Sequence, residues 1–300
     1  MRLTQIQFFL AVVESGSIRA AARKLGVSAP AVTKSVRELE EELHVQLFER
    51  TQHGVVATRV GRAFTARAHV VQSELRKAEE ECEEFAGGST GSVTFGAGPT
   101  PMFLVVPLAL ARFRRKRPDA RVRIVEGLSP VILPMVRDET LDFALALRPV
   151  GELASRLRFR PLYRDTLAIA VRKGHPLRNE RSLSKLQDAE WLAFGAQWLA
   201  EAVDRVFSAA ALRAPRSMTH CETFNSVFAL LASTDMIAAL PSRLLMSPFG
   251  RGVLQQVPVA ERMPSNTQGI VTRADSPLTP AASEMAKVAT AVARQLAARE

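Results

Sequence analysis

The sequence has only two cysteines among its 300 residues, Cys82 and Cys221. Two cysteines so far apart along the chain do not form a disulfide framework, and such sparing use is typical of a reducing compartment. No apolar run approaches the length that spans a bilayer, and the N-terminus lacks the charged-then-apolar pattern of a signal peptide. We therefore expect a cytoplasmic protein that makes no membrane contact.

The common catalytic and metal-binding patterns are also missing. A GxG fragment ends at Gly98, but Pro101 stands where the dinucleotide-binding fingerprint needs its third glycine. The sequence contains no GxSxG elbow, P-loop or HExxH motif. The five histidines are scattered, and His220 and Cys221 would point to opposite faces of a strand. We expect neither an enzyme nor a cofactor or metal site.

The net charge of +10 favours a polyanionic partner, but the charge is unevenly distributed. Residues 1–90 hold 12 Arg and Lys against 12 Asp and Glu, whereas residues 91–300 hold 28 against 18. If the N-terminal third binds a polyanion, recognition must depend on individually placed cations.

The stretch from Ser17 to Leu43 predicts two short helices joined by a tight turn. Ser17 and Ser28 are good N-caps, and Gly26 suits the left-handed end of the first helix. In the second helix the spacing of four, three and four residues predicts one buried face, formed by Val32, Val36, Leu39 and Leu43.

The opposite face of the second helix carries Pro30, Thr33, Lys34 and Arg37 at i, i+3, i+4 and i+7. Such a stripe can lie in the DNA major groove, where Arg and Lys bind guanine and Thr contacts the thymine methyl. The alternative is an ordinary amphipathic helix with a solvated face. The flanking segments favour DNA binding, because residues 3–13 predict a supporting helix and residues 44–58 predict a two-stranded wing with a turn at Gly54.

Residues 1–60 resemble the winged helix-turn-helix of LysR-type transcriptional regulators, in the phrases FFLAVVESGSIRAAARKLGVSAPAVTKSVRELEEEL and LFERTQHGVVATRVG. The resemblance extends over the whole chain in length and segment order. It implies a face toward double-stranded DNA formed by Ser28, Pro30, Ala31, Thr33, Lys34 and Arg37, with wing contacts from Arg50 and His53. Ala29 departs from the family, which often has glutamine or another polar residue there.

A single long helix is expected from Thr58 to Phe85, with apolar residues at coiled-coil spacing: Val60, Phe64, Val71, Leu75, Ala78, Cys82 and Phe85. This seam predicts a homodimer, and two recognition helices on a two-fold axis would read a near-palindromic operator. The alternative is that the stripe packs on the protein's own second domain.

After a Gly-rich hinge at 88–91, strands and helices alternate to the C-terminus, which predicts an α/β domain with a largely parallel sheet. We expect strands at 92–97, 122–125, 141–147, 167–171, 191–194, 218–222, 236–240 and 267–272, and helices at 101–117, 129–138, 198–212, 224–232 and 280–298. The resemblance implies a two-lobed, periplasmic-binding-protein-like effector domain. The resulting organisation is 1–58 DNA-binding, 59–87 linker, 92–163 with 269–300 as lobe I and 164–268 as lobe II.

Ligands of open parallel sheets bind beyond the carboxyl ends of the strands. The segments at those positions supply the candidate effector-binding residues Gly98, Thr100, Ser129, Arg148, Gln197, Trp198, Phe224 and Asn225. Thr100, Ser129 and Arg148 favour a small organic anion, while Trp198 and Phe224 favour an apolar or aromatic body. The alternatives are helix caps for Thr100 and Ser129, a solvated loop position for Arg148 and a core position for Trp198.

Together these features predict an effector-controlled transcription factor that forms a dimer and assembles further into a homotetramer, with RNA polymerase as a candidate partner. A solute-binding protein would need an export signal and no DNA-binding segment. An α/β enzyme fused to a DNA-binding head would need a catalytic constellation that the sequence does not contain.

Overall fold

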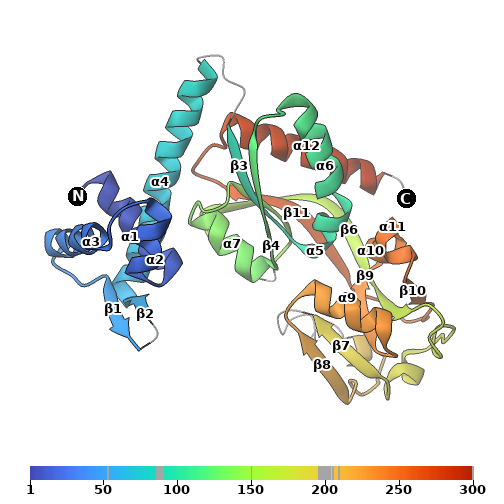
Figure 1. The fold of residues 1–300 in the computed structure, drawn as a ribbon. Coiled ribbons are helices and arrows are strands. Elements are labelled where there is room, and N and C mark those ends of the chain that lie inside the picture. The colour runs from blue at the N-terminus through green and yellow to red at the C-terminus, as the bar shows by residue number, and fades with distance from the viewer. Residues whose placement is uncertain are drawn as a thin grey trace. The chain divides into compact units, whose positions relative to one another are not determined.

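The computed structural model describes residues 1–52, 54–85, 91–149, 151–194, 204, 206–208 and 210–298. They form two compact units (Figure 1). Unit 1 consists of residues 1–91 with 137–141, and unit 2 consists of residues 92–136 with 142–300. No helix in these described ranges is long and apolar enough to cross a membrane.

Unit 1 begins with three helices, α1 (Leu3–Ser15), α2 (Ile18–Leu25) and α3 (Ala29–Leu43). The predicted caps are confirmed: Ser17 accepts the backbone N–H of Ala20, and Ser28 accepts that of Ala31. Gly16 and Gly26 end α1 and α2 in the left-handed conformation. Apolar side chains of the three helices are buried against one another, among them Phe9, Leu10, Val12, Ala21, Val32 and Leu39.

The wing consists of two antiparallel strands, β1 (Phe48–Thr51) and β2 (Gly54–Ala57). Thr58 then caps the long helix α4 (Arg59–Phe85), because its hydroxyl accepts the Gly61 N–H at 2.9 Å. Phe64 packs edge-on against Phe9, with ring centres 5.0 Å apart. Phe64, a member of the predicted dimer seam, is therefore half-buried against the core of unit 1.

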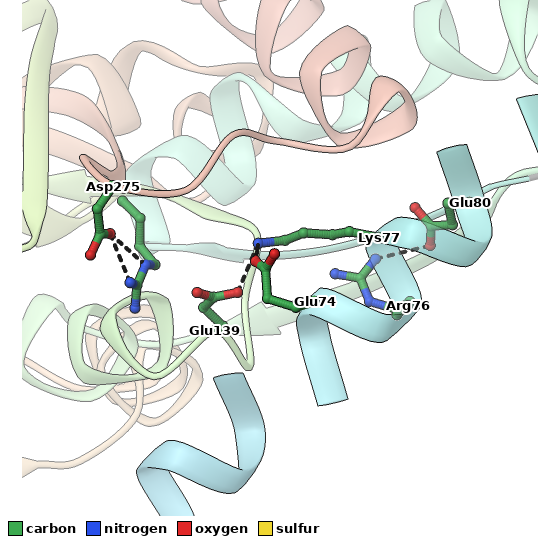
Figure 2. A network of polar contacts seen from close by, with 7 residues as sticks. Glu74, Arg76, Lys77, Glu80, Glu139 and Asp275 are labelled. Atoms are coloured by element: carbon green, nitrogen blue, oxygen red, sulfur yellow. Dashed lines mark hydrogen bonds and ion pairs between the residues drawn. The ribbon is translucent and has the colours of Figure 1, made fainter. Parts of the chain in front are cut away.

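Farther along α4, a network of ion pairs surrounds Lys77 (Figure 2). The Lys77 ammonium lies 2.7 Å from a carboxylate oxygen of Glu74 and 2.7 Å from one of Glu139, and both Lys77 and Glu139 are buried. Arg76 pairs with Glu80 one turn along at 2.9 Å. The Lys77–Glu139 pair joins residues 137–141 to the long helix.

Unit 2 contains one mixed sheet in the order β4-β3-β5-β11-β6-β9-β7-β8, with β10 paired to β6. Its strands are β3 (Ser92–Ala97), β4 (Arg121–Glu126), β5 (Phe143–Leu147), β6 (Leu157–Arg172), β7 (Glu190–Phe194), β8 (Ser217–Cys221), β9 (Ile237–Pro241), β10 (Leu254–Val257) and β11 (Ser265–Arg273). β3 runs parallel to β4 and β5, and β7 runs parallel to β8 and β9. β6 and β11 run antiparallel to their neighbours, so the expected largely parallel sheet is mixed.

β6 is much longer than the strand expected over 167–171. Its first part pairs with β11, and its last part pairs with β9 and β10. Pro161 argues against a strand, but it stands opposite Gly269 at an irregularity in the register. β6 therefore joins two halves of the sheet. The first half consists of β4, β3, β5 and β11, and the second consists of β9, β7, β8 and β10.

The helices of unit 2 are α5 (Pro99–Leu104), α6 (Val106–Lys116), α7 (Ser129–Arg137), α9 (Phe224–Ser233), α10 (Ser242–Met246), α11 (Pro248–Arg251) and α12 (Pro280–Ala297), with a 3₁₀ turn at Leu183–Leu186. α6 and α12 lie side by side (Figure 1) and bury Phe113 and Met285 against the first half of the sheet. The single helix expected over 101–117 is two helices, because Pro107 has no N–H to continue the ladder of α5. The expected hinge and the helix over 198–212 fall mostly outside the described residues.

Candidate DNA-binding face and ligand cavity

Helix α3 separates its buried and exposed residues as the sequence pattern predicts. Val32, Val36 and Leu39 are buried in unit 1. On the other side, six predicted contact residues are all exposed: Ser28, Pro30, Ala31, Thr33, Lys34 and Arg37. Unit 1 therefore presents an exposed stripe that includes Thr33, Lys34 and Arg37, with a buried apolar face behind it.

The two cations of this stripe pair weakly along the helix. Arg37 Nε lies 2.8 Å from Glu41, and Lys34 Nζ lies 3.8 Å from Glu38. The Arg37 and Lys34 side chains are 79% and 80% exposed. Exposed pairs of this kind contribute little stability, so a phosphate or a guanine can replace the carboxylate at small cost.

Hydrogen bonds tie the wing and the residue before it to the turn after α1 and to α3. The Val55 N–H donates to the carbonyl oxygen of Gly16, in the turn between α1 and α2, at 3.0 Å. Glu40 of α3 accepts the backbone N–H groups of Leu47 and Phe48 at 2.7 and 3.1 Å. The sequence pattern did not reveal this role of Glu40, because one acid within an acidic run gives no local signal.

Of the two predicted wing contacts, Arg50 lies in β1, opposite Val55 in the register. His53 lies outside the described residues.

Unit 2 holds a cavity of about 60 Å³ where the strand ends of its two halves meet. Four predicted effector-binding residues line it: Gly98, Thr100, Ser129 and Phe224. The rest of its described lining is mainly apolar and includes Leu128, Leu147, Phe194, Leu240, Pro241 and Leu244.

The other four predicted residues do not join this lining among the described residues. Arg148 lines a neighbouring groove of about 390 Å³, and its guanidinium carbon lies 5.9 Å from the ring centre of Phe159. Asn225 is exposed on α9. Gln197 and Trp198 lie outside the described residues.

Two polar lining residues, Asn266 and Gln268, were not predicted. Both lie on β11, whose place beside β6 depends on pairing between distant segments. Gln268 is 7% exposed, and its Oε1 has no hydrogen-bond partner among the described residues. Ser129 is buried, and its hydroxyl donates to the Leu147 carbonyl oxygen at 2.9 Å.

Comparison with known proteins matches both parts of the chain. Residues 3–62 match the bacterial regulatory helix-turn-helix protein of the lysR family, and residues 86–294 match the LysR substrate binding domain. The chain belongs to the LysR family. It is a LysR-type DNA-binding transcriptional regulator and not an enzyme.

Relatives of this LysR-type regulator match it over most of its length. The transcriptional regulator GbpR of Azospirillum brasilense is 30% identical to this chain. The alignment covers 94% of this chain and 84% of GbpR. The regulator GalR of Pseudomonas putida is 30% identical over 93% of this chain and 70% of its own.

Solved structures of the family share the fold of this LysR-type regulator. The structure of CbnR aligns with a TM-score of 0.70 at 18% identity. The alignment covers 98% of this chain and 99% of the CbnR chain. A variant of full-length OxyR from Pseudomonas aeruginosa has a TM-score of 0.69 at 23% identity, with 99% and 97% of the two chains covered.

Proposed function

We propose that this regulator reads its operator with the exposed stripe of α3 and changes its output when a small organic effector occupies the cavity of unit 2. The observation that carries the first part is the division of α3 into a buried apolar face and an exposed face with Thr33, Lys34 and Arg37. Lys34 and Arg37 supply the charge that a DNA groove attracts, and Thr33 supplies a methyl group for contact with thymine. A related structure, CbnR, is described in complex with its target DNA, which supports this assignment.

The proposal includes a homodimer through α4. Five members of the predicted seam remain exposed on this helix: Val60, Val71, Leu75, Ala78 and Cys82. A second copy of α4 would cover them and place two α3 helices for a near-palindromic site. Further assembly to a tetramer, the cytoplasmic location and the domain limits given above belong to the same proposal.

The DNA-binding part is tested with an operator selected by the purified full-length protein from a random DNA library. Lys34→Ala and Arg37→Ala should each raise the dissociation constant about tenfold, as the loss of roughly 1–3 kcal/mol per base contact predicts. Arg216→Ala removes an exposed arginine of unit 2 and is the charge-matched control. Unchanged footprints for both α3 variants would refute the assignment of the stripe.

The effector part is tested at the cavity. Ser129→Trp places a large side chain where Thr100 and Phe224 also line the space, so it should abolish any ligand response while operator affinity in the absence of ligand stays unchanged. Thr100→Val should blunt the response more mildly. A normal dose–response curve in Ser129→Trp would show that the effector binds elsewhere.

A further inference from the structure

The chemistry of the cavity lining indicates which class of effector it accepts, and this inference rests on the proposed function of unit 2. The polar side chains among the described lining residues are Thr100, Ser129, Asn266 and Gln268, all of them uncharged. The sequence of residues 195–203, which follows lining residue Phe194, contains no Lys, Arg or His. An anion transferred into such a site would lose its hydration without gaining a countercharge, which is costly.

Two of the neutral groups act as acceptors. A serine hydroxyl has one proton to donate, and that of Ser129 is already used on the Leu147 carbonyl at 2.9 Å. What Ser129 Oγ can offer a ligand is therefore its lone pairs. Gln268 Oε1 is an acceptor too, and it is buried without a partner among the described residues. A carboxylate only accepts hydrogen bonds, so it would gain none from the Ser129 hydroxyl or from Gln268 Oε1.

We infer that the effector is an uncharged molecule with an apolar or aromatic body and an O–H or N–H group, an alcohol or primary amide in type, whose donors are accepted by Gln268 Oε1 and Ser129 Oγ. Phe194, Phe224 and Leu128 provide the apolar walls for its body. A donor on the effector would give the buried Gln268 oxygen a hydrogen bond, which it makes with none of the described residues. This class replaces the small anion expected from the sequence, because Arg148 does not line the cavity.

The test uses matched probes of nearly equal shape: benzyl alcohol against benzoate, phenylacetamide against phenylacetate, and 3-methylbutanamide against 3-methylbutanoate. Binding to the full-length protein is measured at pH 7 by calorimetry, with thermal unfolding as a second readout. The neutral member of a pair should bind at least tenfold more tightly than its carboxylate. Tighter binding of the carboxylates would overturn the inference. A loss of carboxylate affinity in the Arg148→Ala variant would also overturn it, because Arg148 would then bind the anion.

The variant Gln268→Met keeps the length of the side chain and removes the acceptor. It should weaken binding of the neutral probes about tenfold. It should also raise the thermal stability measured without a probe, because a buried acceptor that has no partner among the described residues is replaced by an apolar group. Gln255→Met, at a half-buried position of β10 outside the cavity lining, is the matched control and should change neither property. Full neutral-probe affinity in Gln268→Met would overturn the role of Gln268.

The results also separate this inference from the proposed function. If carboxylates bind and Ser129→Trp abolishes that binding, the cavity is an effector site and only the inference fails. If neither class of probe binds at millimolar concentration, both the inference and the assignment of the cavity fail. If a neutral probe binds and Ser129→Trp abolishes that binding, both the inference and the assignment of the cavity are supported.

Discussion

Gly54 of the wing approaches Gly16 so closely that a Cβ added to Gly54 would lie 2.6 Å from the Gly16 carbonyl oxygen. The same oxygen accepts the Val55 N–H at 3.0 Å. The φ angle of Gly54 is +131°, which side-chain-bearing residues rarely adopt. The position of the wing against the turn between α1 and α2 therefore requires a glycine at 54.

Gly54→Ala should destabilise unit 1 by about 2–3 kcal/mol, because backbone strain and the clash with Gly16 act together. Urea denaturation of the full-length protein measures this loss, and operator binding should weaken as the wing shifts. Gly26→Ala is the control: Gly26 also has a positive φ, but nothing lies within 4 Å of its added Cβ. It should cost only about 1–2 kcal/mol. Equal losses would mean that the close approach to Gly16 is unimportant.

Glu41→Gln should strengthen operator binding several-fold. Arg37 must leave the Glu41 carboxylate, 2.8 Å from its Nε, before it can bind DNA, and Glu41 also repels phosphate. The measurement is the dissociation constant at several salt concentrations, and the gain should shrink as salt rises. Glu152→Gln, at an exposed position of unit 2, is the control. Weaker binding by Glu41→Gln would show that this pair orients Arg37 for DNA.

In the buried Lys77–Glu139 pair (Figure 2), loss of Lys77 should lower the free energy of unfolding more than loss of Glu139. Lys77→Met leaves the buried Glu139 carboxylate without this cation and should cost about 3–5 kcal/mol in the free energy of unfolding. Glu139→Gln should cost less, because Lys77 keeps its contact with Glu74 at 2.7 Å. Chemical denaturation of both variants and the double variant measures the coupling. A larger loss for Glu139→Gln would contradict this reading.

Asp165 should make stability fall as the pH rises from about 3.8 toward the raised pKa of this carboxyl in the folded protein. Burial raises the pKa of this carboxyl above its ordinary 3.8, although the Ser242 hydroxyl and the Arg243 N–H bind it. The folded chain then keeps a proton that the unfolded chain has released, so its stability decreases through the window that begins near pH 3.8.

Asp165→Asn should remove this decrease and should be at least as stable as the wild-type protein at neutral pH. Unfolding free energies measured across the acidic and neutral range check it. Asp119→Asn, at an exposed position, should keep the wild-type profile. An unchanged profile in Asp165→Asn would assign the effect to another group.

The helix pair and the exposed stripe of α3 were predictable in detail because their signals are local. The caps at Ser17 and Ser28 and the apolar spacing of α3 act within a few residues, and the structure places each as the pattern indicates. Coiled-coil spacing does not distinguish a partner helix from a neighbour within the same unit, such as Phe9, which contacts Phe64.

The lining of the cavity in unit 2 was predictable only in part. Gly98, Thr100 and Ser129 follow parallel strands, so the rule for strand ends identified them. The same rule identified Arg148, but the backbone after β5 directs it to another groove. No local signal marks Gln268, since β11 joins β6 from about a hundred residues farther along the chain.

The sequence by itself determined the helix pair, the wing and the long helix, because capping, periodicity and turn chemistry act between near neighbours. The family followed separately, from the resemblance of residues 1–60 to known regulators. Only the tertiary structure decided which polar residues line the cavity and that the Ser129 hydroxyl already donates to the Leu147 carbonyl. These facts depend on how distant strands pair and on which hydrogen bonds the fold has already used, and neither is written in any short stretch of the chain.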